Sequence, residues 1–264
     1  MKGAIIGDIV GSIYEFDNLK SKEFELFKPE CEFTDDTVLT VAVAEALLKY
    51  NPENEIEFKE NLIDIFHKYG EMYPDVGYGG HYLSWVENKR RDPYNSCGNG
   101  SAMRTSAVGW YAKSIEECES LAKICAEVTH NHPDGIAGAQ ATAGVIFLAR
   151  NGVSKDELKA YMEKYYTINF TVDEIRPIYE YEIINKTTVP QAFQCFYEAT
   201  DFEDCIRIAI SIGGDSDTVA AIAGSMAEAF FSIPEDIAET GMSYLDEYMS
   251  DIVESFYKKH IEVN

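Results

Sequence analysis

The sequence predicts an all-α protein built from many short and medium-length helices. Three observations support this fold class. Apolar residues recur at helical spacing in most segments, capping residues stand at segment ends, and no stretch alternates apolar and polar residues as a half-buried strand would. Hydrophobic residues make up 46% of the 264-residue chain, which is enough to bury a core. No linker rich in Pro, Gly or Ser divides the chain, so we expect residues 1–264 to form a single domain.

The first two helices are predicted between residues 34 and 70. Residues 34–50 are apolar around most of the helix circumference, which is typical of a buried helix. The Asn-Pro pair that follows is expected to end this helix. Residues 53–69 are amphipathic, and Gly70 suits the position just after the helix end. The side chains expected to face inward from this second helix are Ile56, Ile63, Phe66 and Tyr69.

Two capping boxes mark helix starts in the middle of the chain. Ser114 pairs with Glu117, and Ser154 pairs with Glu157. Between these boxes, residues 135–152 are rich in Gly and Ala. Small residues let helices approach one another closely, so this segment is predicted to be a central helix.

Four helices are predicted in the last third of the chain. A short one begins at Pro190, and Asp201 caps the next, which ends near residue 212. A third runs from about residue 217 to residue 231. The last covers residues 243–260 and ends in three basic residues, where the helix dipole favours positive charge.

The chain is strongly acidic, with 46 acidic and 22 basic residues and a formal net charge of −24. Proteins that track a nucleic-acid backbone or dock on an anionic membrane need clustered Lys and Arg, and this chain has no basic run. Asp8 interrupts the N-terminal apolar stretch, and no apolar run approaches the roughly 20 residues of a membrane span. We therefore expect a cytoplasmic protein that binds neither membrane nor nucleic acid. Its six scattered cysteines are expected to be free thiols.

Two segments, residues 34–37 and 213–218, each place two carboxylates and a hydroxyl at the start of an apolar helix. One acid there is ordinary capping, but two acids leading into a buried helix repel each other as they lose water. A hard divalent cation such as Mg²⁺, Mn²⁺ or Ca²⁺ would remove that repulsion, and four Asp carboxylates would balance two such ions. Zinc is not expected because neither segment offers His or Cys. Solvated helix caps are the alternative interpretation.

Two long irregular stretches, residues 70–100 and 129–134, are expected to carry function. The first ends in a glycine-rich loop at residues 96–101 that leads into a helix. Such a loop exposes backbone N–H groups and can hold a phosphate without lysines, and a plain turn is the alternative. The second contains His130 and His132. No third ligand stands at a zinc-site spacing, so the residues alone favour capping or core histidines.

Taken together, five ordered motifs resemble the ADP-ribosylglycohydrolase family and span most of the chain. The motifs are Gly7-Asp8-Ile9-Val10-Gly11-Ser12 with Glu15, Phe33-Thr34-Asp35-Asp36-Thr37, Gly98-Asn99-Gly100-Ser101-Ala102-Met103-Arg104, Thr129-His130-Asn131-His132-Pro133, and Gly213-Gly214-Asp215-Ser216-Asp217-Thr218 with Ala220-Ala221-Ile222-Ala223-Gly224. The resemblance implies a compact orthogonal multi-helix bundle. It also implies a central cleft with two Mg²⁺ ions, Mn²⁺ being the alternative.

The resemblance assigns roles to individual residues. The residues that map onto the metal ligands are Thr34, Asp35, Asp36, Asp215, Asp217 and Thr218. Those assigned to substrate binding are Ser96, Gly98, Asn99, Gly100, Ser101, Met103, His132, Tyr78 and Gly79, and the first five form the diphosphate cradle. Asp35 or Asp36 would orient or deprotonate the attacking water, and Glu15 would act as acid/base or as a gate. Cys97 stands where some members place an aromatic residue beside adenine, so the adenine-stacking residue is not identified.

The implied activity is Mg²⁺-dependent hydrolysis of the glycosidic bond between ADP-ribose and an acceptor, which reverses ADP-ribosylation. The partner would be an ADP-ribosylated protein or an ADP-ribosyl small molecule. An arginine acceptor is favoured over serine by analogy with short family members. Two alternatives stay open. One is the same chemistry on another ADP-ribose derivative or nucleotide glycoside, and the other is a non-catalytic ADP-ribose-binding or crystallin-like structural member.

Overall fold

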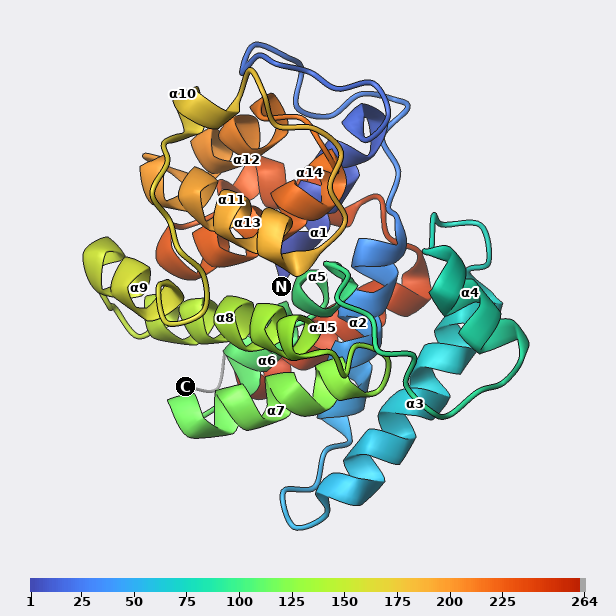
Figure 1. Ribbon diagram of the computed structural model, residues 1–264. Coiled ribbons are helices and arrows are strands. Elements are labelled where there is room, and N and C mark those ends of the chain that lie inside the picture. The colour runs from blue at the N-terminus through green and yellow to red at the C-terminus, as the bar shows by residue number, and fades with distance from the viewer. Residues whose placement is uncertain (262–264) are drawn as a thin grey trace.

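The structure is a computed structural model that describes residues 1–261 as helices joined by loops (Figure 1). The helices are α1 (Lys2–Gly11), η1 (Ser12–Tyr14), α2 (Asp35–Leu48), α3 (Glu55–Met72), α4 (Gly80–Glu87), α5 (Gly100–Met103), α6 (Ser106–Tyr111), α7 (Ile115–Glu127), α8 (Pro133–Arg150), α9 (Lys155–Met162), α10 (Val172–Ile175), α11 (Asn185–Glu198), α12 (Phe202–Ser211), α13 (Ser216–Phe230), α14 (Glu235–Met242) and α15 (Glu247–His260). No β-strand forms within residues 1–261, so the predicted all-α class is confirmed. Over the same range no helix is both long and apolar enough to cross a membrane. All six cysteines are free thiols, as predicted.

Local capping signals account for several helix starts. Asp201 caps α12, and the box predicted at Ser154 opens α9 with both of its reciprocal hydrogen bonds. At Ser114 only half of the predicted box forms. The Ser114 side chain accepts from the Glu117 amide, but the Glu117 carboxylate accepts from the Lys113 amide (2.7 Å) instead of the Ser114 amide.

The predicted end of the second helix is wrong. Helix α3 continues past Gly70 to Met72, because Gly70 lies inside the contact with α4. A Cβ on Gly70 would lie 2.9 Å from a methyl carbon of Val86, so the missing side chain serves close packing and not a helix cap. Ile56, predicted to face inward, is 79% exposed because the first turn of α3 projects beyond the core.

Three further predictions need correction. The stretch 70–100 is not wholly irregular, because it contains α4. Pro190 does not begin a helix but is the sixth residue of α11, where it cannot donate the helical hydrogen bond to the carbonyl of residue 186. Residues 243–260 do not form one helix, because the Asp246 side chain accepts from the Met249 amide and starts α15 anew after α14.

Helix α1 packs along α13 at very short range, a contact that the sequence did not predict. Glycines on three successive turns of α1 face α13: Gly3, Gly7 and Gly11. A Cβ on Gly7 would lie only 2.1 Å from the carbonyl oxygen of Ala220. The close approach places the carboxylates at the far end of α1 beside the first turn of α13.

Helix α8 runs through the middle of the molecule, with α11 and α13 on one side and α6 and α7 on the other (Figure 1). Its small residues permit the close packing that the sequence predicted. A Cβ on Gly144 would lie 2.0 Å from the Tyr161 hydroxyl oxygen, and one on Gly138 would lie 2.2 Å from the side chain of Asn185. The prediction of a central helix is therefore confirmed, with its start two residues earlier, at Pro133.

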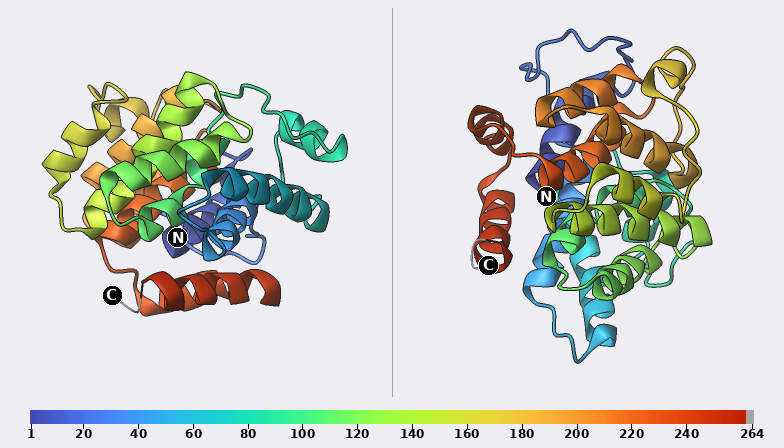
Figure 2. Two further views of the ribbon diagram at one scale, coloured as in Figure 1. Left: turned by 90° about the horizontal axis from the view of Figure 1, so that it is seen from below. Right: turned by 90° about the vertical axis from the view of Figure 1, so that its left-hand side faces the viewer.

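Helix α15 lies on the outside of the bundle and packs against α2 (Figure 2). Glu45 of α2 is buried there and ties three helices together. Its carboxylate accepts from Lys49 (2.8 Å), from Lys68 of α3 (3.2 Å) and from the Tyr248 hydroxyl of α15 (2.7 Å). Burial by itself raises the pKa of Glu45, but these hydrogen bonds outweigh it and lower the pKa to about 2.

The Glu45→Gln variant is expected to be less stable than the wild type at pH 7 by about 1–2 kcal/mol. Because the folded-state pKa of Glu45 lies below its ordinary value of 4.5, this stabilisation is present above pH 4.5 and is lost as the pH falls towards 2. Urea unfolding at pH 7 and pH 3 should therefore show a smaller difference at the lower pH. Glu254→Gln, on the exposed face of α15, is the control and should change neither value.

Candidate active site

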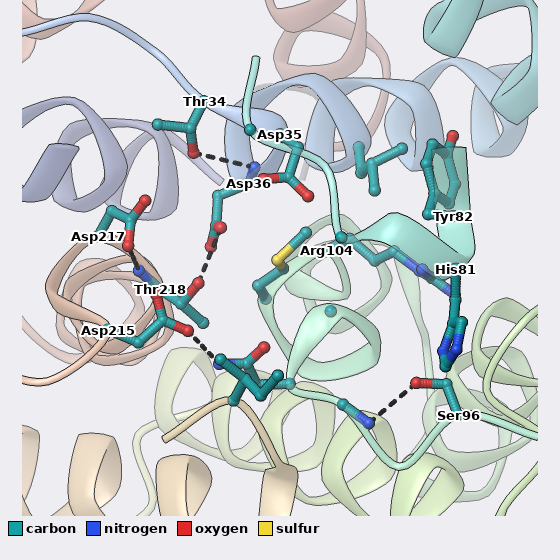
Figure 3. Close-up of a pocket in the computed structure, with 18 of the residues that line it drawn as sticks. Thr34, Asp35, Asp36, His81, Tyr82, Ser96, Arg104, Asp215, Asp217 and Thr218 are labelled. Carbon is teal, nitrogen blue, oxygen red and sulfur yellow. Dashed lines mark hydrogen bonds between the residues drawn. The ribbon is translucent and has the colours of Figure 1, made fainter. Parts of the chain in front are cut away.

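A cavity of about 450 Å³ opens between the N-terminal ends of α2 and α13 and the loop before α5 (Figure 3). The acidic residues of α2 and α13 face one another at one end of it. Ser96 and the glycine-rich loop lie at the other end. The predicted metal ligands that line the cavity are Thr34, Asp35, Asp36, Asp215, Asp217 and Thr218, and Glu15 also lines it. The structure thus brings together all the predicted ligands and catalytic residues.

Helix α2 begins at the cavity because a carboxylate from α1 caps it. Asp8 is fully buried and accepts hydrogen bonds from the amides of Thr34 (2.9 Å) and Thr37 (3.0 Å). It also accepts from the Thr34 hydroxyl (2.6 Å). Since that hydroxyl donates its only hydrogen to Asp8, the Thr34 oxygen can act only as an acceptor or a ligand towards other groups. Asp35 and Asp36 follow in the first turn, where the helix dipole favours negative charge.

A tight turn brings α13 to the same place. Gly213 and Gly214 have φ values of 70° and 77°, a left-handed conformation that glycine adopts without strain. Asp215 follows the turn and accepts from the side-chain amide of Asn99 (2.6 Å), which ties α13 to the glycine-rich loop.

A hydrogen bond joins the two acidic helix ends. The Thr218 hydroxyl donates to Oδ2 of Asp36 (2.9 Å), and the Thr218 amide donates to Oδ1 of Asp217 (2.9 Å). All three side chains are at least 95% buried, with exposures of 2–4%. The acids of α2 and α13 therefore form one cluster and not two separate caps.

The acids of this cluster repel one another. Burial, and then the charges of neighbouring carboxylates, raise the pKa of Asp35, Asp36 and Asp217 well above their usual range. Burial also raises the pKa of Asp215. Within residues 1–261 no lysine or arginine forms an ion pair with any of these four. No described side chain therefore neutralises the cluster through an ion pair.

The donor set fits a hard divalent cation. Carboxylate oxygens of Asp8, Asp36 and Asp217 lie within 4.8 Å of one another, as do those of Glu15, Asp215 and Asp217. Oδ1 of Asp36 is buried, and no described residue donates a hydrogen bond to it. Cations such as Mg²⁺ and Mn²⁺ prefer such oxygen ligands, and a positive ion would relieve the repulsion. These acidic clusters could therefore bind metal.

Glu15 is half-buried at the edge of the cavity and is held by a residue from the other half of the chain. Its carboxylate accepts from the hydroxyl of Tyr181 (2.9 Å), which lies in the segment between α10 and α11. The Tyr181 ring stacks on Phe16, which is 84% exposed, at a centroid distance of 5.9 Å. Burial raises the pKa of Glu15.

The glycine-rich loop is held by its own hydrogen bonds. The amides of Gly98 and Asn99 donate to Oγ of Ser96 (3.0 Å) and to the carbonyl of Ile183 (2.9 Å). The next amide, at Gly100, has no acceptor within residues 1–261, and the same is true of residue 101. Of these two residues only Gly100 lines the cavity, so its amide is the one available to a phosphate group.

The structure places the predicted substrate-binding residues in two groups. Those that line the cavity are Gly79, Ser96, Gly98, Asn99, Gly100 and Met103. Three do not line it. Ser101 is buried and donates to the carbonyl of Gly135 (2.7 Å), and Tyr78 is buried beneath the cavity wall. His132 caps α8 by accepting from the Asp134 amide (3.1 Å).

The cavity is also lined by residues that the sequence did not assign to the site. His130 lines it in place of His132, and Arg104, Tyr82 and Tyr94 form part of its wall. His130 and Arg104 stand inside the motifs quoted above, so that signal was available. Tyr82 and Tyr94 lie in the long stretch expected to be functional, but nothing local distinguishes them from other aromatic residues in that stretch.

Comparisons with known proteins identify the family of the chain. The sequence pattern of the family described as ADP-ribosylglycohydrolase matches residues 1–261. ADP-ribosylhydrolase ARH3 of Mus musculus is 24% identical over 315 residues, covering 89% of this chain and 83% of the relative. ADP-ribosylarginine hydrolase Tri1 of Pseudomonas putida is 25% identical over 279 residues, covering 88% of this chain and 69% of the relative.

A solved structure of an ADP-ribosylglycohydrolase-related protein complex has the same fold. It matches with a TM-score of 0.70 at 22% identity, covering 98% of this chain and 97% of that one. At this identity the likeness bears on the fold alone, whereas the sequence pattern bears on the family. Because that pattern extends from the first residue to residue 261, the chain belongs to the ADP-ribosylglycohydrolase family of hydrolytic enzymes.

Proposed function

We propose that the protein hydrolyses the glycosidic bond between ADP-ribose and an acceptor side chain in a Mg²⁺-dependent reaction. One observation carries the proposal: a single cavity holds both a cluster of buried carboxylates and a glycine-rich loop with free amides. The carboxylates suit a divalent cation, and the amides suit phosphate groups. A ribose joined to a diphosphate would need both features at once.

We propose two Mg²⁺ ions as the cofactor, with Mn²⁺ as the alternative. The residues that would hold them are Thr34, Asp35, Asp36, Asp215, Asp217 and Thr218. Four aspartates balance two divalent charges, and the buried Asp36 oxygen would gain a partner. When bound, the ions would offset the local negative charge and orient the ribose through its hydroxyl groups.

The chain's own carboxylates carry the proton transfers in this proposal. Departure of the acceptor builds positive charge on the ribose. Asp35 or Asp36 would orient the attacking water and accept its proton. Glu15 would protonate the leaving group or move as the substrate enters. Its raised pKa favours the protonated form that an acid needs.

The acceptor is proposed to be arginine in preference to serine. One relative of similar identity carries the printed name ADP-ribosylarginine hydrolase, which supports this choice. The substrate would be an ADP-ribosylated protein or an ADP-ribosyl small molecule. The amide of Gly100, which lines the cavity, would donate to its phosphates, so no basic patch is required.

We also propose that residues 1–264 act as one domain. The cavity takes its walls from both ends of the chain, from Glu15 to Asp217. One cluster of buried apolar side chains extends from Met1 to Phe256, which supports a single core.

A substrate panel tests the proposed function. ADP-ribosyl-arginine, ADP-ribosyl-serine, ADP-ribosylated nucleic acid and O-acetyl-ADP-ribose would each be incubated with Mg²⁺ and with EDTA, and released ADP-ribose measured. We expect release from ADP-ribosyl-arginine with Mg²⁺ and none with EDTA. Calorimetric binding of ADP-ribose without release from any substrate would overturn the enzymatic proposal. Faster release from the serine linkage would overturn only the acceptor assignment.

A further inference from the structure

Arg104 is a buried cation, and no carboxylate within residues 1–261 forms an ion pair with it. It follows α5, and its side chain is fully buried. The guanidinium lies over the ring of Phe66 at 4.8 Å. Only Nη2 forms hydrogen bonds with the described residues, donating to the carbonyl of Cys125 and to Oγ1 of Thr129, each at 2.8 Å. Both Nη2 hydrogens are therefore used, and one of them points at a hydroxyl beside the cavity.

The same Thr129 hydroxyl also forms a hydrogen bond with a residue that lines the cavity. Its Oγ1 lies 2.8 Å from Nδ1 of His130, and it already accepts from Arg104. A guanidinium can only donate, and a threonine hydroxyl has one hydrogen to give. If the Thr129 hydrogen goes to Nδ1, the neutral His130 ring carries its own hydrogen on Nε2.

The Nε2 edge of His130 faces the glycine-rich loop. A Cβ on Gly98 would lie 3.5 Å from Nε2, and one on Gly100 would lie 3.3 Å from it. His130 also lines the cavity. Burial, and then the charge of Arg104, lower the pKa of His130 well below its usual value, so the ring is neutral at pH 7. A neutral ring can donate from only one nitrogen, so its tautomer decides what it offers to a ligand.

We propose that Arg104 and Thr129 are positioning residues that hold His130 as the Nε2–H tautomer, so that the ring donates into the phosphate end of the cavity. This inference rests on the proposed function for the identity of the ligand. The tautomer itself follows from which group donates at each hydrogen bond: Arg104 donates to Thr129, and Thr129 donates to Nδ1 of His130. In the opposite tautomer, Nε2 would present a lone pair to an anionic phosphate, which would be repulsive.

One other acceptor competes for the Thr129 hydrogen. The Tyr94 hydroxyl lies near the Thr129 hydroxyl, which lowers the pKa of Tyr94 against the larger effect of burial. An imidazole nitrogen is a stronger acceptor than a neutral phenol oxygen, and a phenol can itself donate. Because Oγ1 of Thr129 already accepts from Arg104, Nδ1 of His130, the stronger acceptor at 2.8 Å, takes the Thr129 hydrogen.

Nitrogen-15 NMR of the imidazole rings tests the proposal without substrate. The chain has five histidines, and the His130 signals would be assigned by their loss in His130→Gln. We expect a pyridine-type Nδ1 and a pyrrole-type Nε2 for His130 in the wild-type protein at pH 7.5. A pyrrole-type Nδ1 would overturn the proposal.

Variants of Thr129 test whether its hydroxyl sets the tautomer of His130. Thr129→Val, which removes the hydroxyl, should give a mixture of tautomers and bind ADP-ribose about tenfold more weakly by calorimetry. Thr129→Ser should restore both properties, and Thr142→Val, the same change at another buried threonine, should alter neither. If Thr129→Val had the wild-type tautomer and the wild-type affinity for ADP-ribose, the proposed positioning role of Thr129 would be wrong. Failure of the wild type to bind ADP-ribose would instead overturn the proposed function, because the tautomer is measured without ligand.

Discussion

The Asp35→Asn/Asp36→Asn variant is expected to release ADP-ribose at least about a thousandfold more slowly than the wild type. Both carboxylates line the cavity, and Asp36 also accepts from the Thr218 hydroxyl that joins α2 to α13. An amide keeps the size of the side chain but removes the charge that would balance a divalent ion. Because it is also a poor proton acceptor, binding of the ion and activation of water should fail together. Initial rates on ADP-ribosyl-arginine at saturating Mg²⁺ measure the loss.

The same variant is expected to be more stable than the wild type when EDTA is present. Burial and neighbouring carboxylates raise the folded-state pKa of Asp35 and Asp36, so ionising them at pH 7 destabilises the folded protein. Since these folded-state pKa values lie above the unfolded ones, wild-type stability in EDTA should rise as the pH falls from 7, and the variant should lack most of that rise. We expect a gain of about 1–2 kcal/mol at pH 7, the reverse of the usual effect of mutating a buried residue.

A control pair of acids separates these effects from net charge. Glu235→Gln/Asp236→Asn removes two exposed acids from the first turn of α14. It should retain full activity and be slightly less stable, because it weakens a favourable helix-dipole interaction. If the Asp35→Asn/Asp36→Asn protein hydrolysed substrate at the wild-type rate, the acidic cluster would not be the active site. If the Asp35→Asn/Asp36→Asn protein were less stable than the wild type in EDTA, Asp35 and Asp36 would instead stabilise the fold.

The Gly7→Ala variant is expected to be the most destabilising single-methyl change in the helix core. The added Cβ would lie 2.1 Å from the carbonyl oxygen and 2.4 Å from the carbonyl carbon of Ala220. These are backbone atoms of α13, so no side chain can rotate out of the way and the two helices must separate. Overpacking typically costs about 1–3 kcal/mol, and we expect the upper end, with a melting temperature lower by about 5–10 °C. Thermal unfolding followed by circular dichroism measures it.

Gly80→Ala is the matched control for this change. Gly80 begins α4, and a Cβ there would meet no atom within 4 Å. Its melting temperature should match the wild type or lie slightly above it, since alanine favours helix. Because α1 also positions Asp8, folded Gly7→Ala protein should bind Mg²⁺ more weakly as well. Equal melting temperatures for Gly7→Ala and the wild type would show that α1 and α13 can move apart without loss of stability.

Local signals predicted the parts of this structure that depend on neighbouring residues. Thr34, Ser154 and Asp201 cap helices in the way their sequences indicate, because an N-cap bonds to amides two or three residues away. The pairs of acids at the starts of α2 and α13 were recognisable because each pair leads into an apolar helix, where two carboxylates repel each other as they lose water.

Contacts between distant segments could not be predicted in this way. Asp8 belongs to the acidic cluster only because α1 packs against α13, more than 200 residues along the chain. Tyr181 donates to Glu15 across a separation of 166 residues. His130 and His132 are two residues apart at the same helix start, and which of them faces the cavity depends on the packing of α8. The sequence alone carries no local sign of that choice.

A calorimetric titration of Mg²⁺ into EDTA-treated and desalted protein tests most directly whether the acidic cavity is a metal-dependent active site. The wild type is predicted to bind two ions per chain, and ADP-ribose release from ADP-ribosyl-arginine should rise over the same range of Mg²⁺ concentration. The Asp35→Asn/Asp36→Asn protein should bind fewer ions and release no ADP-ribose above background. Wild-type protein that binds no Mg²⁺, or that hydrolyses the substrate fully without it, would contradict the account.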